Sequence, residues 1–168
     1  MSWTSRAVTI AILAAIAPVA SSQAPLESQG VHKIDVCEGQ SPQSQEELTS
    51  CAQNALFDDN WPAFLKWAQR AAKAGDSTAA FWLALEYQDP GPTGAPTFHK
   101  NLVRAYMWYD IAAELHARKI RTLAVTSGTP ETNELEINYR NAVGQDLTRV
   151  QIAAALRLES DWWRAISR

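Results

Sequence analysis

The stretch WAQRAAKAGD, from Trp67 to Asp76, decides the fold of this chain of 168 residues. The alanine pair Ala71 and Ala72 follows Trp67 by four and five positions, and Gly75 and Asp76 come next. Adjacent alanines let two helices approach closely, while an aromatic side chain one turn away fills the wedge between them. Glycine ends helices and aspartate caps them, so Gly75 and Asp76 predict an antiparallel reversal into a second helix.

The same spacing returns 41 positions later, where Trp108 precedes the alanine pair Ala112 and Ala113. The helix that Asp76 caps continues the pattern with Ala79, Leu83, Ala84 and Tyr87, and Ala105 precedes Trp108. A repeated motif of this kind predicts stacked helical hairpins, in which each helix packs against the helix before it and the helix after it. The expected fold is therefore all-α, a short superhelix of antiparallel hairpins.

Local signals outside this motif predict about six helices in total. Ser44 and Glu47 have capping-box spacing, as do Thr148 and Gln151 before the last helix. The remaining boundaries follow from turn residues and apolar periodicity: a first helix ending before Asp58, a second capped by Asp59 or Asn60, a third ending before Asp89, a fourth beginning near Asn101, and a fifth through Leu135, Tyr139 and Val143. The fourth helix has the widest apolar stripe and is expected to be the most buried. No β-strand is predicted.

The N-terminal segment has the pattern of an export signal. Arg6 precedes the uninterrupted apolar run Ala7–Ala17, which is too short to span a bilayer, because that takes about 20 residues. Small residues favour cleavage after Ser22 or after Ala24, and Pro25 favours the former. We therefore expect a signal peptide at 1–22, an extended arm at 23–43, a helical domain at 44–168, and a periplasmic or secreted location.

Two cysteines, Cys37 and Cys51, are expected to form a disulfide, because an even count in an oxidising compartment favours pairing. Closing a loop of this size stabilises the fold by about 3 kcal/mol. A catalytic thiol is the less favoured interpretation, since no neighbouring base or cation in the sequence lowers its pKa.

The motif residues resemble those of the SEL-one-like repeats (SLR), a subclass of tetratricopeptide-like helical hairpins. The resemblance covers roughly Trp61 to Trp163 and includes the residues from Trp67 to Tyr87 named above. It implies a scaffold that binds another protein through a curved surface, in the manner of exported bacterial members. His116 replaces the glycine after the second alanine pair, so this helix is expected to run on. The long segment Asp89–Lys100 replaces a tight hairpin, and it is either functional or a tolerated insertion.

Charge and motifs narrow the function classes. The net charge is −3 with no basic run, which argues against nucleic acid and anionic lipid as partners. No metal, phosphate-loop or nucleophile motif occurs, so no cofactor and no catalysis are expected. Asp110 and Glu114 share a helical face as a possible acid and base, but a solvated edge with Glu114 paired to Arg118 is favoured. A small envelope-acting hydrolase and a structural spacer remain the alternatives.

Aromatic and loop residues are the candidates for contact with a protein partner. Adjacent helical positions point about 100° apart, so a pair of neighbouring tryptophans near the chain end cannot both be fully buried. Large aromatic side chains also dominate the binding energy of protein interfaces. The candidates are Tyr106, Tyr109, Phe98, His99, Trp162 and Trp163.

Overall fold

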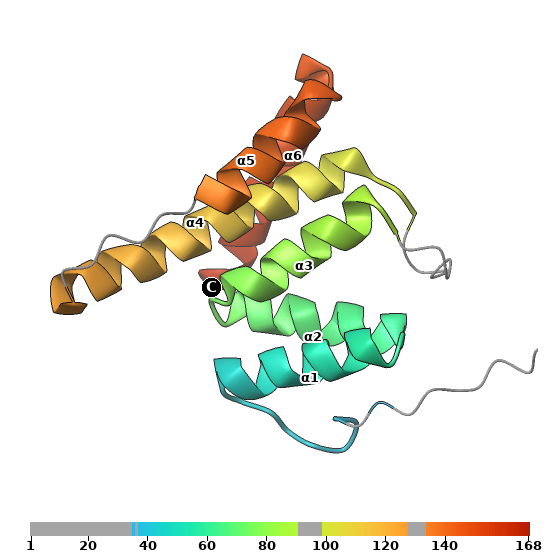
Figure 1. Ribbon diagram of the computed structural model, residues 1–168, viewed down its shortest axis with the longest axis vertical. Helices are drawn as coiled ribbons and strands as arrows, with labels where there is room; N and C mark the ends of the chain where they lie inside the picture. Colours follow the sequence, from blue (N-terminus) through green and yellow to red (C-terminus); the bar gives the residue numbers. More distant parts are fainter. Residues whose placement is uncertain (1–34, 36, 91–98, 128–133) are drawn as a thin grey trace, which may run out of the picture. The chain divides into compact units, whose positions relative to one another are not determined.

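The protein folds into helices throughout the part that the structure describes. The structure, a computed structural model, describes residues 35, 37–90, 99–127 and 134–168. The expected signal peptide, the first part of the arm and Phe98 lie outside these residues. The described helices are α1 (Gln45–Phe57), α2 (Trp61–Lys73), α3 (Ser77–Gln88), α4 (Leu102–Ser127), α5 (Glu134–Gln145) and α6 (Arg149–Ile166) (Figure 1). The predicted all-α class is confirmed, and no described residue belongs to a strand.

The predicted caps form in three dimensions. At α1 the backbone N–H of Glu47 donates to the Ser44 hydroxyl at 3.1 Å, and the Glu47 carboxylate accepts from the Ser44 N–H. Thr148 and Gln151 form the same reciprocal pair at α6, and the Asn60 side chain caps α2. These hydrogen bonds satisfy backbone N–H groups of the first helical turn that have no partner within the helix. Both partners lie within a few residues of each other, so the start of each helix could be predicted from the sequence.

Helices α1 with α2 and α3 with α4 pack as hairpins, and α2 also contacts α3 (Figure 1). At the α2–α3 reversal Gly75 has φ of +100°, a conformation that side chains with a Cβ rarely adopt. The Asp76 carboxylate then accepts the N–H of Thr78 at 2.7 Å and of Ala79 at 3.1 Å. Glycine and aspartate thus perform the two roles that the sequence assigned to them.

The repeat-motif side chains lie in the core. Trp67 and Trp108 are 2% and 4% exposed. The alanines at the motif positions are nearly all fully buried. The buried motif residues are Trp67, Ala71, Ala72, Ala79, Leu83, Ala84, Tyr87, Ala105, Trp108, Ala112 and Ala113. Their burial agrees with a packing role.

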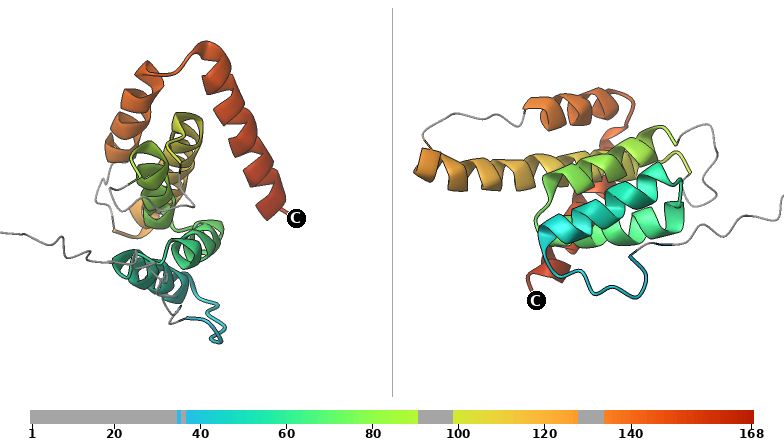
Figure 2. Two further views of the ribbon diagram at one scale, coloured as in Figure 1. Left: turned by 90° about the vertical axis from the view of Figure 1, so that its right-hand side faces the viewer. Right: turned by 60° about the horizontal axis from the view of Figure 1, so that its bottom comes forward.

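Helix α4 runs on past His116 to Ser127, as the missing glycine predicted. Most of the side chains of α4 that the structure describes as buried lie in its first half, and α4 contacts α3, α5 and α6. The simple sequential stacking expected from the repeats is wrong at the C-terminus. Helices α5 and α6 diverge from the turn between them (Figure 2). Helix α6 contacts α4. The rings of Trp108 and Trp162, 5.7 Å apart in an edge-to-face arrangement, form part of this contact.

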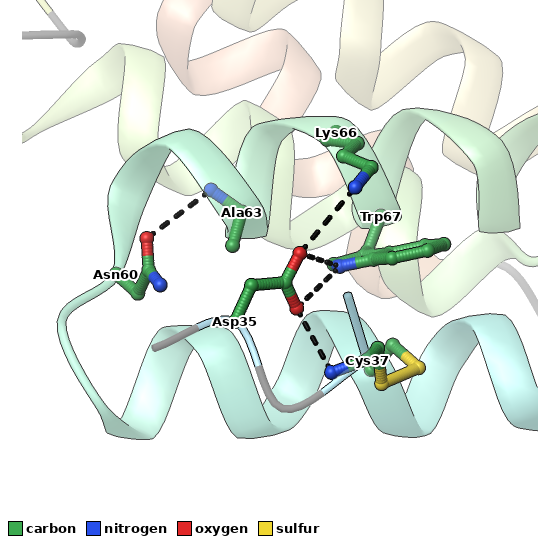
Figure 3. A network of polar contacts seen from close by, with 7 residues as sticks. Asp35, Cys37, Asn60, Ala63, Lys66 and Trp67 are labelled. Atoms are coloured by element: carbon green, nitrogen blue, oxygen red, sulfur yellow. Dashed lines mark hydrogen bonds and ion pairs between the residues drawn. A yellow bond between two sulfur atoms is a disulfide. The ribbon is translucent and has the colours of Figure 1, made fainter. Parts of the chain in front are cut away.

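The described part of the arm packs on α1 and α2. The Cys37–Cys51 disulfide joins it to α1, with 5.9 Å between the Cα atoms. The Asp35 carboxylate accepts the indole N–H of Trp67 and the backbone N–H of Cys37 (Figure 3). Arg70 donates to the carbonyl oxygen of Pro42 at 3.2 Å. The arm is therefore held to the helices by Asp35 as well as by the disulfide, whereas the sequence predicted the disulfide alone.

Within the described ranges, no helix combines the length and apolar character needed to cross a membrane.

Candidate functional site

Tyr109 is fully buried, so its prediction as a partner-binding residue is wrong. It packs between the rings of Phe81 and Tyr139, at 5.4 and 5.5 Å, and its hydroxyl donates to the side-chain oxygen of Gln88 at 2.6 Å. Burial, with a smaller contribution from Tyr139, raises the pKa of Tyr109 far above its usual range. The sequence pattern could not distinguish the core-facing tyrosine from its neighbours on the same wide apolar stripe.

The other candidates on α4 and before it differ in burial. Tyr106 is half-buried, and its ring packs against Gly144 of α5. The contact is close, since a Cβ atom added at Gly144 would lie 3.1 Å from the Tyr106 ring. His99 is exposed just before α4, and the neighbouring Phe98 lies outside the described residues.

Trp162 and Trp163 are both half-buried, which agrees with the expectation that neighbouring helical positions cannot both be buried. Trp162 packs on Trp108 and belongs chiefly to the α4–α6 contact. Trp163 donates its indole N–H to the Glu159 carboxylate at 3.0 Å. The Arg118 guanidinium lies over the Trp163 ring, 4.1 Å from its centroid. Trp163 is thus the candidate that lines a cavity beside charged groups.

That cavity, which we call the α4–α6 cleft, has a volume of about 410 Å³ and is bordered by three helices. Its size falls within the range of roughly 300 to 1,000 Å³ typical of ligand pockets. Helical spacing of three and four aligns its α4 residues on one face. The lining residues are Asp110, Ala113, Glu114 and Arg118 of α4, Ile137 and Arg140 of α5, and Glu159 and Trp163 of α6.

Two of the three carboxylates in the cleft are paired with arginines. Arg140 donates to Asp110 at 2.5 Å and so ties α5 to α4. Arg118 donates to Glu114 at 2.9 Å, and Arg121 lies 3.3 Å from the same oxygen. The hydrogen bond from Arg118 is the main cause that lowers the pKa of Glu114. The pairing of Glu114 with Arg118 is the one that the sequence favoured.

Glu159 differs from the other two carboxylates. Burial is the main cause that raises its pKa, and the carboxylates of Asp110 and Glu114 raise it further, while the Trp163 indole N–H acts in the opposite direction. Among the described residues, no lysine, arginine or histidine forms an ion pair with Glu159. Sequence reasoning missed Glu159, because only the packing of α6 on α4 brings it beside Asp110 and Glu114.

A lowered pKa holds Glu114 as a carboxylate, which disfavours it as a general acid. A second polar pair lies nearby, where the His116 Nδ1 is 2.8 Å from a carboxylate oxygen of the buried Glu136. No group of three or more metal-binding side chains occurs among the described residues.

Comparisons with known proteins add no relative: no family model matches the chain, and neither a curated protein nor a solved structure does.

Proposed function

We propose that the protein is an exported, non-catalytic scaffold of SLR-like helical hairpins that binds one partner protein in the periplasm or outside the cell. The disulfide supports the oxidising compartment, and the spacing of Trp67, Trp108 and their alanine pairs supports the repeat resemblance. The location rests further on the signal pattern at 1–22.

The observation that carries the proposal is the α4–α6 cleft with Trp163 at its edge. Rigid helices hold a half-buried tryptophan, carboxylates and arginines around one cavity. Tryptophan and arginine are enriched among the residues that contribute most to binding at protein interfaces. Because Arg118 and Arg140 are already engaged with carboxylates, the cleft has a fixed charge pattern that selects a partner by complementarity.

Affinity capture tests the proposal. The tagged, exported protein is recovered from the cell envelope and from the culture fluid of its own cells, and the proteins that co-purify are identified. We expect one stoichiometric protein whose binding, remeasured with both components purified, is weakened at least about tenfold by Trp163→Ala. The matched control is Trp61→Ala, because Trp61 lies on α2, away from the cleft. Repeated recovery of no specific protein contradicts the proposal.

A hydrolase acting on envelope components is the second candidate, favoured by one observation. Asp110 and Glu159 are neighbouring carboxyl groups, and the pKa of Glu159 is raised. Such a pair is able to divide the roles of acid and base. For this candidate, Asp110→Asn abolishes turnover of envelope material while the fold is retained. A scaffold has no turnover to lose.

A further inference from the structure

Helix α5 packs along α4 with a carboxyl group among its buried side chains. The two helices lie side by side (Figure 1). Their antiparallel interface is marked by three pairs of contacting residues: Gly144 with Tyr106, Arg140 with Asp110, and Glu136 with His116. The buried side chains of α5 are Glu136 and Val143. An ionisable group therefore stands where the inner face of a helix normally presents an apolar side chain.

The Glu136 carboxyl group is only partly satisfied by hydrogen bonds. It is 7% exposed, and one of its oxygens lies 2.8 Å from Nδ1 of His116. The other oxygen, Oε2, is buried and has no hydrogen-bond partner among the described residues. A buried carboxylate is unfavourable unless a positive charge or further hydrogen bonds compensate it. The charge of the imidazole that faces Glu136 therefore decides how favourable the contact between α5 and α4 is.

The imidazole of His116 is able to exchange a proton with water, because the side chain is 24% exposed. Imidazole is the side chain that ordinarily changes its charge between about pH 5 and 8. With a neutral imidazole the pair carries the full negative charge of the carboxylate, whereas one additional proton makes the pair neutral overall, whichever side chain holds it. A falling pH favours the state that binds more protons, so it favours the docked position of α5.

Other charged side chains of this part of the fold come from four helices. Those of α4 and α5 are Glu114, held by Arg118, Asp110, held by Arg140, and the exposed Lys119 and Glu134. The helices that also contact α4 contribute Glu86 of α3 and Glu159 of α6, which faces Asp110 and Glu114. Because the arginines are engaged by other carboxylates, His116 is the ion-pair partner that the structure shows for Glu136.

We propose that His116 and Glu136 form a proton-dependent clasp, which holds α5 on α4 in mildly acidic solution and loosens as the pH rises through neutrality. The proton comes from the solvent, and no covalent bond between heavy atoms changes. The clasp controls access to an aromatic side chain, because Tyr139 of α5 packs on the buried Tyr109 with 5.5 Å between the ring centroids. Release of α5 uncovers Tyr109. The inference goes beyond the proposed function and does not depend on it.

Amide hydrogen exchange tests the clasp in the exported, disulfide-bonded protein. Protection is measured from about pH 5.5 to 8.5 and corrected for the exchange rate of unstructured amides at each pH. We expect the protection of α5 to fall at least about tenfold across this range, while that of α1 and α2 stays constant. Glu136→Gln and Glu136→Leu remove the titrating carboxyl group, so the protection of α5 should no longer depend on pH. The leucine variant keeps the test decisive if the glutamine variant does not fold.

His116→Gln removes the group that takes up the proton and should lower the protection of α5 at the acid end of the range. The matched controls are Glu134→Gln and His99→Gln, which change exposed residues of the same two types and should retain the pH response. The inference is overturned if α5 in the unaltered protein shows no loss of protection as the pH rises, or if all helices change together. A pH response that persists in the folded Glu136 variants also overturns it, as does full acid protection in His116→Gln.

Discussion

The indole N–H of Trp67 lies 2.9 Å from each oxygen of the Asp35 carboxylate, although 32 positions separate the two residues in the chain. Trp67 is 2% exposed, so this N–H has little access to water as an alternative acceptor. Asp35 also accepts the N–H of Cys37 and lies 3.4 Å from the Lys66 ammonium (Figure 3). One carboxylate thereby connects the arm, the disulfide and α2.

Asp35→Ala should lower the free energy of unfolding by about 1 to 3 kcal/mol, because it leaves the buried indole N–H of Trp67 without its acceptor. Urea unfolding of the oxidised protein measures the difference. Lys66→Ala is the matched control, since it removes only a half-exposed ion pair with Asp35 and should change stability by less than about 1 kcal/mol. Equal effects of the two changes would refute the role assigned to the indole bond.

Ala112→Leu should destabilise the protein by about 1 to 3 kcal/mol, because extra methylenes at a fully buried alanine force the neighbouring helices apart. Thermal unfolding checks this prediction. Ala153→Leu makes the same change at an exposed position of α6 and should have little effect. If Ala112→Leu is tolerated as well as Ala153→Leu, close packing at the second alanine pair is not what holds α4 in place.

Trp162→Ala should loosen α6, since Trp162 supplies the aromatic contact with Trp108 and only Ala155 of α6 is fully buried. We expect a loss of about 2 kcal/mol from burial and ring contact together. Hydrogen exchange should become faster in α6 and remain unchanged in α1 and α2. Val150→Ala, at a position that is 80% exposed, is the control. Unchanged exchange in α6 would show that other contacts hold this helix.

Glu159→Gln should stabilise the protein at neutral pH. A carboxyl group whose pKa is raised by folding stabilises the folded state fully below its unfolded-state pKa, and this contribution is lost as the pH rises through its folded-state pKa. At neutral pH the ionised Glu159 is therefore unfavourable, and the glutamine variant should gain about 0.5 kcal/mol, a small value because the site is half exposed and screened. The gain should vanish as the pH falls below the carboxyl range. Thermal unfolding from neutral to acid pH measures it, and a gain that grows toward acid pH would contradict the assigned direction.

The features that could be predicted from the sequence are those set by interactions between residues close together in the chain. The capping boxes at Ser44 and Thr148, the caps Asn60 and Asp76, and the turn glycine Gly75 act within a few residues, so a single sequence contains both partners of each interaction. The extension of α4 past His116 followed from the same kind of evidence, because a helix continues where no residue stops it.

The candidate site was less accessible to such reasoning. Asp110, Glu114 and Trp163 were each noticed, but as separate features of two helices. Glu159 gave no signal of its own, and Tyr109 was assigned to a surface although it is fully buried. The position of Glu159 and the burial of Tyr109 both depend on which face of α4 packs against α5 and α6. Contacts between residues 30 or more positions apart, such as that of Arg140 with Asp110, cannot be predicted from local residue spacing.

The sequence by itself determined the helices, their caps, the antiparallel reversals and the pairing of its two cysteines, because short-range hydrogen bonds, backbone preferences and a single choice of partner decide these. Only the tertiary structure decided that α6 returns to α4, that Asp35 receives the Trp67 indole, and that Glu159 meets Asp110 and Glu114 in one cleft. The physical reason is that packing of a helix face depends on the combined shape and charge of all its neighbours, which distant parts of the chain supply together.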